Sequence, residues 1–151
     1  MRLLWKMPPG NDIFLVNMDE PSKTRVLILD DDEDFLDETK ALLEEAGYEA
    51  FICEKVVEVL IAIRRYKPDC LILDLKMPVY NGEEFLPWLW STFPELPVIV
   101  CTGVPDVHKH HLFKLGIRHI LHKPFSHKVL FKTIAQAIEE TPQHSLRKKS
   151  A

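Results

Sequence analysis

Acidic side chains follow two short apolar runs of the chain, in a pattern that suits metal-assisted phosphoryl chemistry. Asp30 and Asp31 come directly after the run Val26–Leu29. Asp74 comes directly after a second run, at residues 70–73. Carboxylates gathered at one site stay ionised only beside a cation. Clustered oxygen ligands suit Mg²⁺, which keeps several of its waters and is commonly completed by phosphate oxygens. These three residues therefore predict a magnesium-binding site at which a phosphoryl group is bound beside the ion.

A hydroxyl and an ammonium stand at equivalent places further along the chain. Thr102 follows the apolar run Val98–Cys101, and Lys123 follows a weaker run that ends at His122. Each of these residues alone is common in a loop or a turn. Their joint occurrence after four apolar runs is not expected by chance, so we expect them to flank the carboxylates.

The elements that must position these residues alternate between two kinds of pattern. Short apolar runs, typical of buried strands, alternate with segments in which apolar residues recur at helical spacing. The predicted strands are 26–29, 48–53, 70–73, 98–101 and 117–122. The predicted helices are 34–46, 54–66, 83–93, 106–115 and a last helix that begins after an N-cap at Ser126 and ends near residue 140.

Five such βα units predict an α/β fold with a parallel sheet covered by helices on both faces. A common arrangement is the flavodoxin-like doubly wound (βα)5 sandwich, in which the five strands have the order 2-1-3-4-5. In that order the first and third strands are neighbours, and ligands bind outside the carboxyl ends of the strands at this point. The acidic residues after both strands would then meet at one edge of the sheet.

The composition limits the class of protein. The chain has 151 residues, of which 46% are hydrophobic and 28% are charged, and its formal net charge is −4. These values predict one folded domain rather than a disordered chain. The negative charge gives no general attraction to nucleic acid, and the apolar runs are too short to span a bilayer. We therefore expect neither nucleic acid nor a membrane as a partner.

The ends of the chain differ in character from its middle. We expect the folded domain to cover residues 24–140. Residues 1–23 contain a Pro-Pro-Gly break and are predicted to be an extension outside the fold, and Met18 is an alternative start of translation. Residues 141–151 are polar and basic and are predicted to form a flexible tail.

Three cysteines lie in or beside apolar segments. Cys53, Cys70 and Cys101 do not have the spacing of a zinc knuckle, and an odd number cannot pair fully within one chain. Reduced thiols in the core of a cytoplasmic protein are the simplest interpretation.

Four segments together resemble the receiver domain of two-component response regulators, the CheY-like family. They read VLILDDDEDF, PDCLILDLKMPVYNG, VIVCTG and HKPF. The spacing between them also fits, with 43 residues from Asp31 to Asp74, 28 more to Thr102 and 21 more to Lys123. The resemblance covers about residues 24–140. It implies a signalling phosphoacceptor that catalyses only its own phosphorylation and dephosphorylation, rather than an enzyme acting on other substrates.

The resemblance implies a role for each acidic residue. Asp74 is the expected phosphoacceptor, which takes the phosphoryl group from a phosphohistidine of a sensor histidine kinase or a histidine phosphotransfer protein. Asp31 and Asp74 are expected to bind Mg²⁺ directly, together with the backbone carbonyl of Lys76. Asp30 is expected to act mainly through a water molecule.

The resemblance also implies roles around the acids. Lys123 is expected to neutralise a phosphoryl oxygen during transfer, and Thr102 to hydrogen-bond the phosphoryl group afterwards. The bond between Lys123 and Pro124 is expected to be cis. Pro78 and Gly82 are expected to shape the loop after Asp74.

One position departs from the family pattern. Three residues before the lysine, the family commonly has a tyrosine or phenylalanine that moves inward on phosphorylation and changes the outer surface. Here that position is Ile120, which has neither a ring nor a hydroxyl. The usual readout of phosphorylation is therefore in question, although the phosphoryl chemistry is not.

Two other features leave alternatives open. Pro87 lies inside a predicted helix, and Trp88 and Trp90 after it either pack on the domain or form an exposed aromatic contact for a partner. Five histidines between residues 108 and 122 form either a surface that gains charge at low pH or, less simply, a metal site.

Two other functions compete with the receiver interpretation. A haloacid-dehalogenase-like phosphatase would use Asp30 and Asp32, but it leaves Asp74 without a role and needs a further acidic pair after Lys123. A non-phosphorylated adaptor would keep the fold, but it usually lacks one of the acids or the lysine. About eleven residues follow the last predicted helix, so we expect no output domain and an output by contact with an unknown protein target.

Overall fold

Strands and helices alternate along the described chain, which is residues 21–77, 81–105 and 108–141 of this computed structural model. The strands are β1 (Arg25–Leu29), β2 (Glu49–Cys53), β3 (Cys70–Asp74), β4 (Val98–Thr102) and β5 (His119–His122). The helices are α1 (Glu33–Glu45), α2 (Val56–Tyr66), α3 (Gly82–Thr92), α4 (Lys109–Leu115) and α5 (His127–Glu139). All ten predicted elements are present. Their ends agree within a residue or two, except at α4, whose predicted start at Asp106 lies outside the described residues.

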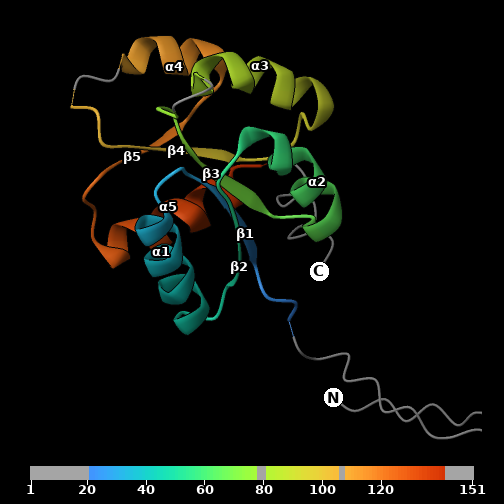
Figure 1. Cartoon of the computed structure of the whole chain (residues 1–151), viewed down its shortest axis with the longest axis vertical. Helices are drawn as coiled ribbons and strands as arrows, with labels where there is room; N and C mark the ends of the chain where they lie inside the picture. Colours follow the sequence, from blue (N-terminus) through green and yellow to red (C-terminus); the bar gives the residue numbers. More distant parts are fainter. Residues whose placement is uncertain (1–20, 78–80, 106–107, 142–151) are drawn as a thin grey trace, which may run out of the picture.

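The strands form one parallel sheet in the order β2-β1-β3-β4-β5, which confirms the predicted flavodoxin-like topology (Figure 1). β1 lies between β2 and β3, so the winding of the chain reverses there. The register pairs Leu29 with Leu73, and Asp74 with Cys101. The carboxyl ends of β1, β3 and β4 therefore lie side by side at one edge of the sheet.

Helices cover both faces of the sheet. α1 and α5 pack on one face, where the buried side chains include Leu36, Leu43 and Ile134. α2, α3 and α4 pack on the other face, around residues such as Val59 and Leu86. β3 and β4 are buried along their whole length, which explains why their sequences are continuous apolar runs rather than alternating ones.

The acidic run after β1 divides between two structural roles. Asp32 is the N-cap of α1, and its Oδ1 accepts a hydrogen bond from the backbone N–H of Phe35 at 3.1 Å. Glu33 and Asp34 occupy the first turn, where negative charge is favourable beside the helix dipole. These three acids therefore stabilise the helix start, and Asp30 and Asp31 remain for the edge of the sheet. The predicted N-cap at Ser126 is confirmed in α5.

The two tryptophans of α3 have different environments. Trp88 is 46% exposed, whereas Trp90 is half-buried and donates a hydrogen bond from Nε1 to the carbonyl of Leu96 at 3.3 Å. The ring of Trp90 lies against Gly116, where a Cβ would come within 3.3 Å of it. Gly116 also has a φ of 105°, which favours glycine at the end of α4. Trp90 thus packs on the domain, whereas Trp88 is exposed, with its ring centroid 5.4 Å from that of Phe85, and its role as a partner contact stays a prediction.

The three cysteines are free and buried, as predicted. Burial raises the pKa of Cys53 to about 11 and that of Cys101 to about 12, and it also raises the pKa of Cys70. Within the described ranges, the structure contains no helix that is long and apolar enough to cross a membrane. Most of the predicted extension and tail lies outside these ranges, so both stay predictions.

Candidate functional site

The predicted site residues end neighbouring strands at one edge of the sheet. Asp30 follows β1 directly, Asp74 is the last residue of β3, and Thr102 is the last residue of β4. Lys123 follows β5, and its backbone N–H donates to the carbonyl of Thr102 at 2.8 Å. We call this edge the strand-end rim. Its residues are separated along the chain by whole βα units, and the parallel sheet brings them together.

Three carboxylates gather at the β1–β3 side of the rim. Asp30, Asp31 and Asp74 each offer an oxygen atom, and these atoms all lie within 4.8 Å of one another. Asp30 is 1% exposed and Asp74 is 8% exposed, whereas Asp31 is exposed. The backbone N–H of Lys76 donates to Asp74 Oδ1 at 3.1 Å, and that of Asp32 donates to Asp30 Oδ1 at 3.0 Å. Two of the three carboxylates are thus held by backbone donors from the residue two positions later.

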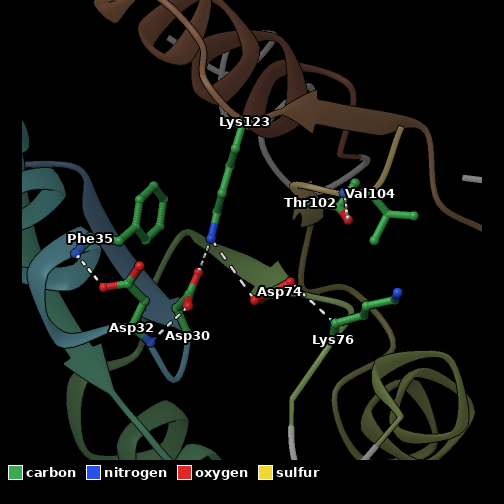
Figure 2. A network of polar contacts seen from close by, with 8 residues as sticks. All are labelled: Asp30, Asp32, Phe35, Asp74, Lys76, Thr102, Val104 and Lys123. Atoms are coloured by element: carbon green, nitrogen blue, oxygen red, sulfur yellow. Dashed lines mark hydrogen bonds and ion pairs between the residues drawn. The ribbon is translucent and has the colours of Figure 1, made fainter. Parts of the chain in front are cut away.

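Lys123 reaches across the rim to these acids (Figure 2). Its Nζ lies 2.5 Å from Asp30 Oδ2 and 3.9 Å from Asp74 Oδ2. The ring of Phe35 lies beside the same ammonium, with its centroid 3.9 Å from Nζ. Phe35 in turn contacts the ring of Phe125 edge-on, with centroids 6.2 Å apart. The start of α1 and the loop after β5 are therefore joined through an aromatic pair that supports the ammonium.

The crowding of charge shifts two pKa values. Burial raises the pKa of Asp74; the Lys76 N–H acts in the opposite direction, and the charge of Asp30 adds to the rise. Burial lowers the pKa of Lys123, but the hydrogen bond and charge of Asp30 outweigh it, so this pKa is raised. The ammonium is therefore firmly charged, while Asp74 gives up its proton less readily than an exposed aspartate. A second cation at this site would favour the ionised carboxylate.

The three carboxylates fit a magnesium ion. They are oxygen donors, they lie close enough to share one ion, and one of them is open to solvent for the waters that Mg²⁺ retains. No other group of three or more potential ligands from His, Cys, Asp and Glu is close enough for this among residues 21–77, 81–105 and 108–141. The ligand role predicted for the carbonyl of Lys76 stays a prediction, since its described contact is made through its N–H.

Thr102 lies on the β4 side of the rim. It is fully buried, and its Oγ1 accepts a hydrogen bond from the backbone N–H of Val104 at 3.2 Å. In Figure 2, the Thr102 side chain lies to one side of the end of the Lys123 side chain, with its hydroxyl next to the Val104 N–H. The structure therefore brings all the predicted side chains to one edge, with the threonine set apart from the charged network.

Comparison with known proteins agrees with this geometry. A family model described as the response regulator receiver domain matches residues 26–135. The chain belongs to this family. Five parallel strands in the order described above, with helices on both faces, are therefore the receiver fold of two-component signalling.

Individual relatives show how far the similarity extends. The response regulator MprA of Mycobacterium leprae is 31% identical over 118 residues, which are 78% of this chain and 52% of that protein. The chain thus spans about half the length of the curated relatives it matches. A CheY-like receiver domain protein from Methanospirillum hungatei is 30% identical with a TM-score of 0.72, covering 79% of this chain and 96% of its own. The beryllofluoride-activated NtrC4 receiver domain dimer is 33% identical with a TM-score of 0.71, covering 77% of this chain and 97% of its own.

The family match decides against the phosphatase alternative. That alternative needs Asp30 and Asp32 to share the site, but Asp32 caps α1 and Asp31 lies in the acidic group instead. The predicted cis bond between Lys123 and Pro124 is present. Pro78 lies outside the described residues, and Gly82 begins α3.

The structure shows the environment of Ile120, the residue at which the chain departs from the family pattern. Ile120 pairs with Val100 in the sheet, is half-buried and packs against the core on the face covered by α2, α3 and α4. Two histidines of the predicted surface contact glutamate side chains. His111 Nε2 lies 3.2 Å from Glu83 Oε2, and His119 Nε2 lies 2.9 Å from Glu140 Oε2.

Phe35 is the residue of this site that sequence reasoning missed. In the sequence it is one apolar residue of an amphipathic helix. The available signal was its place in the first turn after the acidic run, which puts its side chain near the end of β1. That Lys123 would extend over its ring depended on the distance between α1 and the loop after β5, which only the fold sets.

Proposed function

We propose that this receiver protein accepts a phosphoryl group on Asp74 from a phosphohistidine of a sensor histidine kinase or a histidine phosphotransfer protein. In this step an Asp74 oxygen forms a bond to phosphorus while the bond from phosphorus to the histidine nitrogen breaks. The imidazole leaves with the electron pair, and Asp74 becomes an acyl phosphate. The observation that carries the proposal is the place of the Asp74 carboxylate, which has an oxygen within 4.8 Å of those of the other two acids and lies 3.9 Å from the Lys123 ammonium.

The residues that would hold Mg²⁺ are Asp31 and Asp74 directly, Asp30 through water, and the backbone carbonyl of Lys76. When bound, Mg²⁺ supplies positive charge that keeps the carboxylates ionised and offsets the charge of the phosphoryl oxygens. The Lys76 N–H holds Asp74 Oδ1 at 3.1 Å, which leaves Oδ2 as the oxygen that faces Lys123.

Lys123 and Thr102 have separate tasks in this proposal. The flexible stem of Lys123 allows Nζ to move from Asp30 Oδ2 to a phosphoryl oxygen and neutralise it. A hydroxyl has one proton to donate as well as lone pairs to accept with. Thr102 therefore retains a donor for a phosphoryl oxygen even while it accepts from the N–H of Val104.

The partner's histidine is proposed to approach along a groove beside the rim. The groove has a volume of about 680 Å³ and lies between α1 and the start of α5. Lys123 is among its lining residues, together with Phe35, Leu42 and Phe125. A groove lined by apolar and charged side chains, with Lys123 of the reacting network among them, suits the side of a helix that carries the histidine.

Beryllofluoride with Mg²⁺, followed by NMR amide spectra, tests the acceptor. The wild type should shift its spectrum, and Asp74→Asn should abolish the shift. Asp32→Asn is the matched control, because asparagine caps α1 as well as aspartate does and the shift should remain. An unchanged wild-type spectrum would identify the protein as the non-phosphorylated adaptor instead.

Phosphotransfer from a radiolabelled phosphohistidine donor tests the reaction itself. The wild type and Asp32→Asn should take up label, and Asp74→Asn should not. Label on Asp74→Asn would place the acceptor elsewhere. Profiling the same reaction against the histidine kinases of the source organism would identify the donor.

A further inference from the structure

The outer face of α2 carries aliphatic side chains where solvent-exposed helices normally carry polar ones. Val57 is 65% exposed and Ile61 is 70% exposed, the two highest values among the large hydrophobic side chains of the described residues. They lie one helical turn apart. The buried residues of the helix, which include Val59 and Ile63, lie on its opposite side. The aliphatic pair therefore points directly away from the core.

The neighbouring helix α1 shows the ordinary pattern. Apart from Ala41, its exposed positions carry charged side chains, which include Glu38, Glu44 and Glu45. Val57 and Ile61 are also β-branched, which lowers their helix propensity relative to the straight-chain residues that usually occupy such sites. Packing within the described part of the chain and helix propensity account for neither residue, and exposed aliphatic side chains that lie together mark contact with another surface.

Charged residues on the same face are arranged by sign along the helix. Glu58 lies in the first turn of α2, and Arg64 and Arg65 lie in the last turn. All three are exposed. Within the described part of the chain none of them makes an ion pair, and Arg65 lies over the ring of Tyr66 at 5.4 Å. An acid near one end, bases at the other and the exposed Ile61 between them make a surface that is complementary to itself in the antiparallel direction.

We infer that the outer face of α2, formed by Val57, Glu58, Ile61 and Arg65, joins two copies of this chain across a two-fold axis. In an antiparallel pair with Ile61 at the axis, Glu58 of each copy faces Arg65 of the other. Because Glu58 and Arg65 are seven residues apart, they lie on the same flank of the helix, and equal flanks face each other in antiparallel helix pairs. A parallel pair would instead place opposite flanks of the two helices together, so that Glu58 and Arg65 would not meet. The contact is isologous and closes as a dimer.

This inference is independent of the phosphoacceptor proposal. α2 contributes none of the rim residues, which come from the ends of β1, β3, β4 and β5. The contact is small, so we expect a weak dimer with a dissociation constant of about 0.1 mM.

Sedimentation of the full chain over a concentration series tests the contact. The wild type should dimerise, and Ile61→Asp should raise the dissociation constant by about tenfold or more. Phe113→Asp on α4 is the matched control, since Phe113 is also a half-exposed apolar residue and should leave the constant unchanged. Circular dichroism checks that both variants stay folded. A wild type that is monomeric at about 1 mM, or equal effects of the two substitutions, would overturn the inference.

A charge exchange tests the pairing. Glu58→Arg and Arg65→Glu should each weaken the homodimer, whereas an equimolar mixture of the two variants should form a heterodimer in which both charge pairs are restored. A mixture no stronger than the separate variants would contradict the antiparallel pairing.

Oxidative crosslinking tests the register. Ile61→Cys lies at the axis and should link to itself, whereas two copies of Val57→Cys would be about 12 Å apart and should not. The native cysteines are buried and do not compete. Equal crosslinking at both positions would indicate a parallel pair and overturn the proposed geometry.

Discussion

On the β1–β3 side of the rim, three carboxylates and one ammonium lie within a single network, whereas on the β4 side Thr102 is buried and bonded to a backbone amide. Both sides occupy the same edge of the sheet. The first side is organised by opposite charges at short range and is incompletely neutralised. The second is organised by packing and one neutral hydrogen bond. We therefore expect the contribution of the charged side to stability to depend strongly on cations and pH, and that of the neutral side to depend on neither.

Removing the ammonium should have the largest effect. Lys123→Met keeps an apolar stem but leaves Asp30 buried without its partner, so the free energy of unfolding should fall by about 2–3 kcal/mol, less than for a fully buried pair because Lys123 reaches solvent. Phosphorylation of Asp74 should slow by about 100-fold or more through loss of a charge at the developing phosphoryl oxygens. Urea unfolding and phosphotransfer rates measure the two effects. An unchanged stability would show that the acids are neutralised by other means.

Adding Mg²⁺ should stabilise the protein through the charged side. At about 100 times its dissociation constant, an ion that binds only the folded state adds about 2.7 kcal/mol to the free energy of unfolding. Asp31→Asn should remove most of this gain and Asp32→Asn should not, because only Asp31 lies in the acidic group. Urea unfolding with Mg²⁺ and with chelator makes the comparison. Equal gains in both variants would place the ion elsewhere.

Asp74→Asn should stabilise the metal-free protein by about 1 kcal/mol at neutral pH. The pKa of Asp74 is raised in the folded state, so the folded state holds this proton longer than the unfolded chain does. The contribution of Asp74 to the free energy of unfolding therefore falls as the pH rises from about 4 through the raised pKa, and it levels off above that pKa. The difference between the variant and the wild type should vanish below pH 4. Unfolding curves in chelator across this range provide the test, and a difference that persists in acid would contradict it.

Thr102→Val should cost about 1 kcal/mol, since the Val104 N–H loses its acceptor while the side-chain volume barely changes. The cost should be the same with and without Mg²⁺ and at all pH values between 4 and 8. Thr102→Ser, which retains the acceptor, is the control. A loss that depends on Mg²⁺ would show that Thr102 already belongs to the charged network before phosphorylation.

Phe35 should have the smallest effect specific to the ammonium. A double-mutant cycle between Phe35→Leu and Lys123→Met should give a coupling of about 0.5–1 kcal/mol, the usual size for a cation on an aromatic face. Phe35→Tyr keeps the ring and should keep the coupling. Zero coupling would mean that the ring only packs against Phe125.

The sequence predicted most of the fold because its signals are local. Continuous apolar runs identified β3 and β4, and helical spacing with caps such as Ser126 identified the helices. The candidate site could be predicted from the sequence for the same reason, since each of its polar residues directly follows an apolar run. The sequence predicted that α4 starts at Asp106, which lies outside the described residues, and within them the helix begins at Lys109.

By itself, the sequence determined which residues end the strands, and strand order then placed Asp30, Asp74 and Lys123 at one edge. Only the tertiary structure decided which acid pairs with the ammonium, that Phe35 supports it, and that Thr102 stands apart. These outcomes depend on distances of a few ångströms between elements far apart in the chain, which residue types and periodicity do not specify. The orientation of Val57 and Ile61 away from the core was likewise set by the face that α2 turns to the sheet.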